Sequence, residues 1–209
     1  MIKSVLYKII EFLILFIILP ISFAFDFALE IKMTAGLLGV IYSMLVLLIV
    51  ERKTVKMMSN LNFKMFFKQT FFKLLVIAII TSAFVWITNK ELLFNVLLNK
   101  PKLWLIILFI YSLFSVYPQE LIYRTFYFQR YEQLFANKNV FILINAIVFS
   151  LAHLLFRNTL VLVLTFVGGL LFALTYNKTR STLLVSIEHA IYGCWLFTVG
   201  MGDMLGFPA

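Results

Sequence analysis

Histidine occurs only twice in this chain, and both copies lie inside long apolar runs: His153 in VFILINAIVFSLAHLLF and His189 in TLLVSIEHAIYGCW. A third apolar run, PQELIYRTFYF, carries Glu120 and Arg124. Ionisable side chains are costly in hydrocarbon, so within membrane segments they face one another or a wet cavity. A carboxylate beside an imidazole can deprotonate a water molecule that attacks a carbonyl group, and a second imidazole can donate to the resulting oxyanion. We therefore predict a catalytic or ion-handling site inside a membrane.

The composition agrees with an integral membrane protein. Of 209 residues, 63% are hydrophobic and 13% are charged, and the mean hydropathy is +1.03. One soluble core could not bury that much apolar surface, so lipid must surround most of it. Asp26 and Glu30 follow the first apolar run where a cleavable signal would have small residues, so we expect no removed leader. We interpret the chain as one integral membrane domain with lipid as its main surroundings.

The apolar runs predict an all-α integral membrane protein, a multi-pass bundle of about seven (six to eight) transmembrane helices. The candidate spans are 9–25, 33–50, 71–88, 103–128, 140–156, 159–176 and 182–201. Residues 103–135 are too long for one untilted span, and Pro118 divides them, so a kink or a fresh helix start is expected there. This region leaves the choice between seven and eight crossings open.

Charge placement predicts the orientation. Residues 54–70, TVKMMSNLNFKMFFKQT, interleave Lys with Met and Phe, which is typical of an amphipathic helix lying in the interface. We place 51–73 and the N-terminus on the cytoplasmic side. The net charge of +9 comes from residues that flank spans opposite anionic headgroups, so we expect no nucleic-acid partner. Short loops favour a bacterial plasma membrane.

Helix arithmetic predicts which of these residues meet. If Asn137-Lys138-Asn139 forms a turn between antiparallel helices, Glu120 lies 18 residues before its middle and His153 lies 15 after it. At ~1.5 Å per residue both lie roughly 20–30 Å from the turn. A second turn, at 177–180, brings His189 to a comparable height, so we expect Glu120, Arg124 and both histidines to face one internal cavity. Glu120 and Arg124 are four residues apart and can pair on one helix face.

Zinc is an alternative ligand for two histidines and a carboxylate. The chain has no HExxH motif, and the three side chains come from three helices, so their spacing argues little for a metal. We expect neither a metal nor a cofactor.

Three short motifs, in order, make a family resemblance specific. PQELIYR resembles the EExxxR motif of the CAAX protease and bacteriocin-processing (CPBP) family of intramembrane glutamic endopeptidases, Phe149 to His153 resembles its FxxxH motif, and His189 to Gly193 resembles part of its HxxxN/D motif. The resemblance covers about residues 103–195. It implies catalytic-core helices over 103–201 and hydrolysis of a polypeptide near its C-terminus. Residues 1–102, to which we assign the N-terminal spans and the interfacial helix, are compatible with the family in hydropathy alone.

The chain departs from the family pattern at two positions. In the family, the first glutamate of the pair works with the FxxxH histidine to activate water, and here that residue is Gln119. The second glutamate and the arginine, Glu120 and Arg124, support the site. The final Asn or Asp, an oxyanion-side partner of the last histidine, is Gly193 here. A carboxamide is not a general base, so either Glu120 or Glu188 substitutes or hydrolysis is slow or absent.

A proteolytically silent relative, acting as a membrane immunity factor, scaffold or binding protein, therefore stays open as an alternative. The candidate catalytic residues are Gln119, Glu120, His153 and His189, with Arg124, Phe149, Glu188 and Gly193 in supporting roles. Purely structural roles are alternatives for some of these residues. Both histidines can be hydrogen-bonded core residues, and Glu188 can be a buried acid bonded to a neighbouring helix. Tyr111, Tyr117 and Tyr131 are predicted interface anchors. Glu11, in the first span, has no evident partner.

Overall fold

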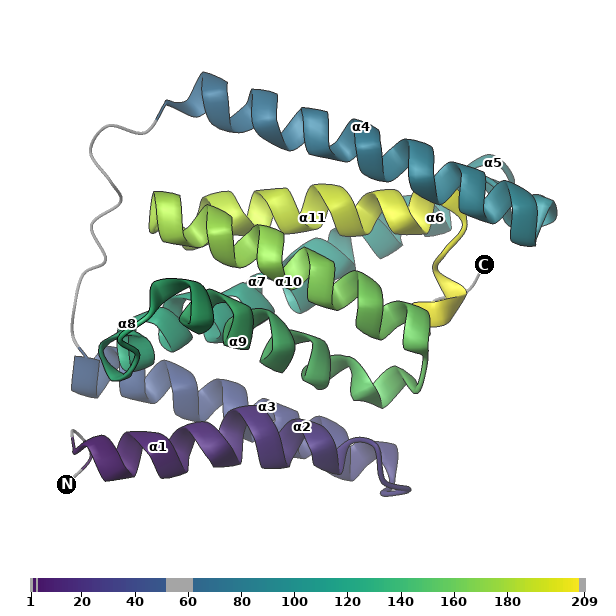
Figure 1. Ribbon diagram of the computed structural model, residues 1–209. Coiled ribbons are helices and arrows are strands. Elements are labelled where there is room, and N and C mark those ends of the chain that lie inside the picture. Colours follow the sequence, from purple (N-terminus) through teal and green to yellow (C-terminus); the bar gives the residue numbers. More distant parts are fainter. Residues whose placement is uncertain (1, 3, 52–61, 207–209) are drawn as a thin grey trace.

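The computed structural model describes residue 2 and residues 4–51 and 62–206, which fold into helices without a strand among them. Seven helices in this part of the chain are long and apolar enough to cross a membrane, as predicted. They span Val5–Ser22, Leu29–Glu51, Phe63–Thr88, Pro101–Leu134, Lys138–Phe156, Thr159–Thr179 and Thr182–Val199. Their axes run roughly along one direction, with the chain starting at the end of the bundle where α4 also begins (Figure 1).

Within these spans the regular helices are interrupted by wider or tighter turns. The α-helices are α1 (Val5–Leu13), α2 (Leu19–Ser22), α3 (Leu29–Leu45), α4 (Phe63–Thr88), α5 (Asn95–Asn99), α6 (Pro101–Ile110), α7 (Tyr117–Glu120), α8 (Tyr127–Tyr131), α9 (Lys138–Leu151), α10 (Thr159–Thr179) and α11 (Thr182–Val199). Only α5 lies outside the spans, in the connection between α4 and α6.

Two prolines, Pro20 and Pro118, lie in the interior of spans, and each follows a π-helical turn. Pro20 comes after the π turn Ile14–Ile18, and Pro118 comes after the π turn Tyr111–Val116. Proline lacks an N–H group and its ring collides with the carbonyl four residues earlier, and a π turn relieves both problems by inserting an extra residue. The helix therefore continues through Pro118 from Pro101 to Leu134 as one element. No fresh start occurs there, so this region contributes one crossing.

Asparagine and serine side chains set where the following helices begin. The Oδ1 atom of Asn137 accepts hydrogen bonds from the amides of Asn139 and Val140 and caps α9. The Oγ atom of Ser181 accepts from the amide of Leu184 and caps α11. Such caps satisfy amides that have no partner inside the helix. The predicted turn at 137–139 is therefore displaced: the connection lies at 135–137, and Lys138 and Asn139 already belong to α9.

The predicted interfacial helix at 54–70 lies partly outside the described residues. Residues 54–61 fall there, and from Phe63 onward the segment belongs to α4, which runs without a break to Thr88. No glycine or proline interrupts residues 63–88, so a helix capped by Asn62 propagates directly into the span. The expectation of a separate helix over 63–70 is therefore corrected.

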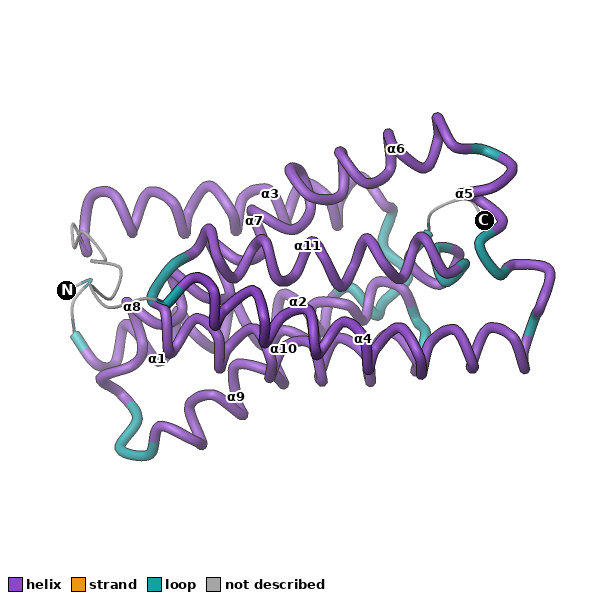
Figure 2. Tube along the Cα trace, turned by 90° about the horizontal axis from the view of Figure 1, so that it is seen from above, coloured by secondary structure: helices purple, strands orange, loops and turns teal. Residues whose placement is uncertain are grey.

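Helix α11 runs through the middle of the bundle (Figure 2). Half of its most apolar stretch is buried, compared with 11% for Leu29–Glu51, which faces outward over most of its surface. Gly169 of α10 lies where an added Cβ would be 3.1 Å from the backbone of Ala146, so this glycine permits α9 and α10 to pack closely. The core that positions the site is thus formed mainly by the C-terminal helices.

Aromatic side chains fill much of this core. Phe16, Phe126, Tyr127 and Tyr131 have no exposed surface. The prediction of Tyr111 and Tyr131 as interface anchors is wrong, because both are buried, whereas Tyr117 is 47% exposed. Aromatic rings supply large apolar area, and a buried phenol needs a partner for its hydroxyl group.

Candidate active site

The imidazole of His189 is held between two side chains of the long helix Pro101–Leu134. Its Nδ1 atom lies 2.8 Å from Oε1 of Glu120, and its Nε2 atom lies 3.1 Å from the hydroxyl of Tyr111. The ring also stacks on Phe172 of α10, with 4.3 Å between the centroids. These contacts fix both the position of the ring and the direction in which each nitrogen points.

The carboxylate of Glu120 connects His189 to Arg124. Its Oε2 atom is 3.3 Å from Nε of Arg124, four residues further along the same helix, and neither side chain has exposed surface. Arg124 also donates to Oδ1 of Asn145 at 2.8 Å, and its guanidinium group lies over the ring of Phe149 at 4.7 Å. The ion pair that the four-residue spacing allowed is present, and it lies behind His189.

His153 lies in the 3-10 turn Ala152–Phe156, directly after α9. Its Nδ1 atom is 2.8 Å from the carbonyl oxygen of Phe149. A carbonyl oxygen only accepts hydrogen bonds, so Nδ1 carries a proton, and in the neutral ring Nε2 has a free lone pair. His153 is thus prepared to accept a proton at Nε2.

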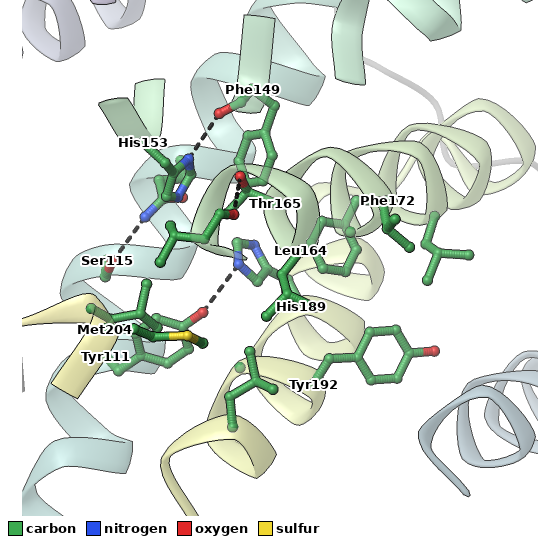
Figure 3. Close-up of a pocket in the computed structure, with 18 of the residues that line it drawn as sticks. Tyr111, Ser115, Phe149, His153, Leu164, Thr165, Phe172, His189, Tyr192 and Met204 are labelled. Atoms are coloured by element: carbon green, nitrogen blue, oxygen red, sulfur yellow. Dashed lines mark hydrogen bonds between the residues drawn. The ribbon is translucent and has the colours of Figure 1, made fainter. Parts of the chain in front are cut away.

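A cavity of about 150 Å³ lies between the long helix, the end of α9, α10 and α11. The residues that line it include polar side chains and most of the candidate site residues: Tyr111, Ser115, Gln119, Phe149, His153, Thr165, His189, Tyr192 and Gly193. Figure 3 shows the rings of His153, His189 and Tyr111 arranged around it. The rest of the lining is mostly apolar and includes Leu164, Val167 and Leu171 of α10. The space is large enough for water molecules beside polar partners.

Gln119 lines the same cavity as the two histidines. Its side-chain nitrogen donates to the hydroxyl oxygen of Ser115 at 2.8 Å, and its buried Oε1 atom has no hydrogen-bond partner. An unpaired buried acceptor is costly, and a water molecule in the cavity would satisfy it. A carboxylate at position 119 would therefore stand at the cavity wall.

Three of the candidate residues do not reach the cavity wall. Glu120 and Arg124 lie behind His189 and do not line the cavity, so the expectation that both would face it is corrected. Glu188 is directed toward α4, where its Oε1 atom is 2.7 Å from Nζ of Lys73 and accepts from Tyr192 at 2.9 Å. Neither glutamate is in place to take a proton directly from water in the cavity.

Tyr111 is the site residue that the sequence prediction missed. Tyr111, Ser115 and Gln119 recur every four residues and therefore share one helix face, and all three line the cavity. This row of polar residues within an apolar run could have been used to predict that Tyr111 faces the site. Among the described residues, no group of three or more His, Cys, Asp or Glu side chains gathers closely enough to hold a metal ion.

The comparison with protein families agrees with the motifs. Residues 101–195, a little under half of the chain, match the family described as type II CAAX prenyl endopeptidase Rce1-like. No curated protein and no solved structure matches the chain. The matched segment begins with α6 and ends within α11, so it contains Gln119, both histidines and Gly193. The resemblance predicted from three motifs is confirmed: the chain carries an Rce1-like type II CAAX prenyl endopeptidase family domain over residues 101–195.

Proposed function

We propose that this protein is an intramembrane endopeptidase that hydrolyses a peptide bond near the C-terminus of a membrane-associated polypeptide. The observation that carries the proposal is that Gln119, His153 and His189, from three different helical elements, line one cavity inside the bundle. The apolar wall from α10 suits a substrate whose neighbouring groups are apolar. The family match supports the reaction class and a polypeptide substrate.

In the proposed reaction, His153 takes a proton from water through its free Nε2 atom. The hydroxide oxygen forms a bond to the peptide carbonyl carbon, and the carbonyl oxygen becomes an oxyanion. The C–N bond then breaks, and the proton held by His153 passes to the departing nitrogen. Oε1 of Gln119, which is buried without a hydrogen-bond partner, can accept a hydrogen bond from the attacking water and orient it. Glu120 and Arg124 keep His189 oriented.

Gln119 makes this reaction slow. His153 remains as the base, but a carboxamide at position 119 can only orient the water and cannot share in removing its proton, and a positioned acid–base group typically contributes ~10²–10⁴-fold to the rate. We therefore expect weak hydrolysis by the native chain. Gln119→Glu places a carboxylate of nearly the same size beside the cavity that His153 lines, and so it should increase the rate.

The test compares cleavage of a membrane-anchored peptide library by the native protein and by Gln119→Glu in matched detergent. Gln133→Glu is the control, because it makes the same chemical change at an exposed position outside the cavity. We expect Gln119→Glu to raise the rate at least tenfold and Gln133→Glu to leave it unchanged. Equal rates for all three proteins would contradict the proposed place of the attacking water beside position 119.

The second candidate function is polypeptide binding without hydrolysis, as a membrane immunity factor, scaffold or binding protein. The presence of Gln119 in the cavity wall favours it, because this side chain can hold a peptide group by hydrogen bonds but cannot activate water. Saturable peptide binding without cleavage by both the native protein and Gln119→Glu would support this alternative.

The proposed arrangement assigns residues 103–201 to the catalytic core and residues 1–102 to supporting spans. We propose that the N-terminus is cytoplasmic, in a bacterial plasma membrane. Among the described residues, the end of the bundle that carries the N-terminus has seven basic residues: Lys8, Lys64, Lys68, Arg130, Lys138, Lys178 and Arg180. The other end has five, namely Lys32, Lys90, Lys100, Lys102 and Arg157. Figure 1 shows these two ends of the helices. Excess Lys and Arg favour the cytoplasmic side.

A further inference from the structure

The hydroxyl group of Tyr111 occupies the space that a side chain at position 193 would need. A Cβ atom added to Gly193 would lie 2.1 Å from the Tyr111 oxygen and 2.4 and 2.5 Å from two ring carbons. Real Cβ atoms are not found so close to other atoms. Tyr111 and Gly193 are therefore complementary: the glycine is required for the phenol to stand where it does.

The same hydroxyl contacts the imidazole that faces the cavity. It lies 3.1 Å from Nε2 of His189, and Tyr111 itself lines the cavity while only 8% of its surface is exposed. Nδ1 of His189 is bonded to Glu120, so a neutral ring presents Nε2 as an acceptor and the phenol as its donor. The phenol is thus a hydrogen-bond donor at the cavity wall.

The surrounding structure holds the Tyr111 ring in place. Tyr111 begins the π turn Tyr111–Val116, and its ring packs edge-on against Phe197 of α11, with 4.8 Å between the centroids. Only the hydroxyl hydrogen needs to move for the phenol to change partners, because it turns about the bond between the ring and the oxygen. A donor fixed in this way costs little reorganisation when charge develops beside it.

We propose that Tyr111 is a catalytic residue whose hydroxyl group donates a hydrogen bond to the oxyanion of the substrate. This inference rests on the proposed peptidase function and supplies the donor that a side chain at position 193 cannot supply here. When a peptide carbonyl enters the cavity, the Tyr111 hydroxyl turns from Nε2 of His189 to the carbonyl oxygen. No proton is transferred in this step; the phenol only exchanges one hydrogen-bond acceptor for another.

The first test removes the hydroxyl group alone, with Tyr111→Phe in the Gln119→Glu protein. Tyr117→Phe is the matched control, because Tyr117 is exposed and lies six residues after Tyr111, at the start of α7. We expect Tyr111→Phe to lower kcat ~10²–10³-fold, as the loss of one oxyanion donor does, with a much smaller change in KM. An unchanged kcat would overturn the proposal, and a raised kcat would show that the phenol blocks the cavity instead.

The second test does not need enzymatic activity. The chain contains only two histidines. If the protein is produced with isotopically labelled histidine, its nuclear magnetic resonance spectrum therefore shows signals from these two imidazoles alone. We expect Tyr111→Phe to shift the Nε2 signal of His189 and to leave His153 unaffected. Gly193→Ala should give the same shift without removing the phenol, because the new methyl group must displace the hydroxyl from His189.

The two tests separate the possible failures. Unchanged His189 signals in both variants would overturn the role of Tyr111 even if the protein cleaves peptides. Shifted signals together with no cleavage by any variant would confirm the pairing of Tyr111 with His189, but would overturn both its donor role and the proposed peptidase function.

Discussion

Two groups of buried and half-buried polar side chains link distant parts of this bundle, and they differ in how completely their hydrogen-bonding atoms are paired. The N-terminal cluster consists of Glu11, Tyr42, Glu51, Arg130 and Tyr131, and it joins α1, the end of α3 and α8. The cavity cluster consists of Tyr111, Gln119, Glu120, Arg124, His153 and His189. Both lie in segments that are otherwise strongly apolar.

In the N-terminal cluster, both oxygens of Glu11 accept hydrogen bonds. Its Oε2 atom accepts from Nε of Arg130 at 2.7 Å and from the hydroxyl of Tyr131 at 2.9 Å, and its Oε1 atom accepts from Tyr42. The Nη1 atom of Arg130 donates to Glu51 at 2.8 Å. A fully paired buried network holds its helices in one arrangement and leaves little capacity for a substrate.

In the cavity cluster, some buried hydrogen-bonding atoms have no hydrogen-bond partner. Oε1 of Gln119 has no partner, and Oε2 of Glu120 and Nε of Arg124 face each other without an aligned hydrogen bond. His153 and His189 reach the cavity wall, whereas the N-terminal cluster does not line that cavity. The comparison teaches that burial of charge alone does not single out a candidate site, and the proposed function rests instead on an unpaired acceptor that lines a cavity together with two histidines.

The largest stability effect is expected at the N-terminal cluster. Arg130→Ala leaves the buried carboxylate of Glu11 and the half-buried carboxylate of Glu51 without their shared partner, which should lower the free energy of unfolding by roughly 3–5 kcal/mol. Thermal unfolding in detergent measures this loss, with Lys178→Ala as an exposed control on the same side of the bundle. If Arg130→Ala destabilised no more than the control, the network would not hold the N-terminal helices as described.

A somewhat smaller effect is expected for Arg124→Ala, because Glu120 keeps its hydrogen bond to His189. Removing the arginine still leaves a buried charge without its counter-ion, so a loss of up to ~3–5 kcal/mol is expected. Arg124→Ala combined with Glu120→Gln should be less destabilising than the sum of the two single changes. Additive losses in a double-mutant cycle would contradict the pairing.

Much of the architecture could be predicted from local patterns. The seven spans follow from runs of apolar residues, and the Glu120–Arg124 pair follows from helical spacing. The partner of Glu11 could not be found in this way, because Arg130 lies 119 residues further along the chain, and only tertiary packing brings them together. The same limit applies to the salt bridge between Glu188 and Lys73, which comes from another helix.

The residue types of the candidate site could be predicted, but not which of these residues line the cavity and which lie behind them. Hydropathy and motif spacing indicated that Gln119 and both histidines belong together, and their catalytic roles stay predictions. The sequence pattern did not distinguish Gln119 at the cavity wall from Glu120 and Arg124 behind it, since these three lie a few residues apart on one helix. Tyr111 was interpreted as an interface anchor because the gap at Gly193 that admits its ring exists only in the folded bundle.

The smallest effect is expected in the loops at the opposite end of the bundle from the N-terminus. Asp26 pairs there with Arg157, whose hydrogen bond and charge hold the pKa of Asp26 below its ordinary value of 3.8. Because the folded pKa is the lower one, the pair stabilises the protein above that ordinary value and loses this effect as the pH falls through the folded pKa. Asp26 is exposed, so Asp26→Asn should lower Tm by at most about 2 °C near neutral pH.

At low pH, Asp26→Asn and the unaltered protein should converge in Tm as Asp26 becomes protonated. Thermal unfolding measured at several pH values between neutral and about 3 checks this, and a difference that grew toward acid would contradict the sign of the shift.

The cavity is the central claim, and the rate of peptide cleavage per folded molecule tests it most directly. In the Gln119→Glu protein, His153→Ala should abolish cleavage while changing Tm little, because His153 bonds only a backbone carbonyl of its own helix. Arg130→Ala should do the opposite, lowering Tm while the molecules that remain folded still cleave. Cleavage that survives His153→Ala, or that disappears with Arg130→Ala at full folding, would contradict the assignment of chemistry to the cavity and of structure to the N-terminal cluster.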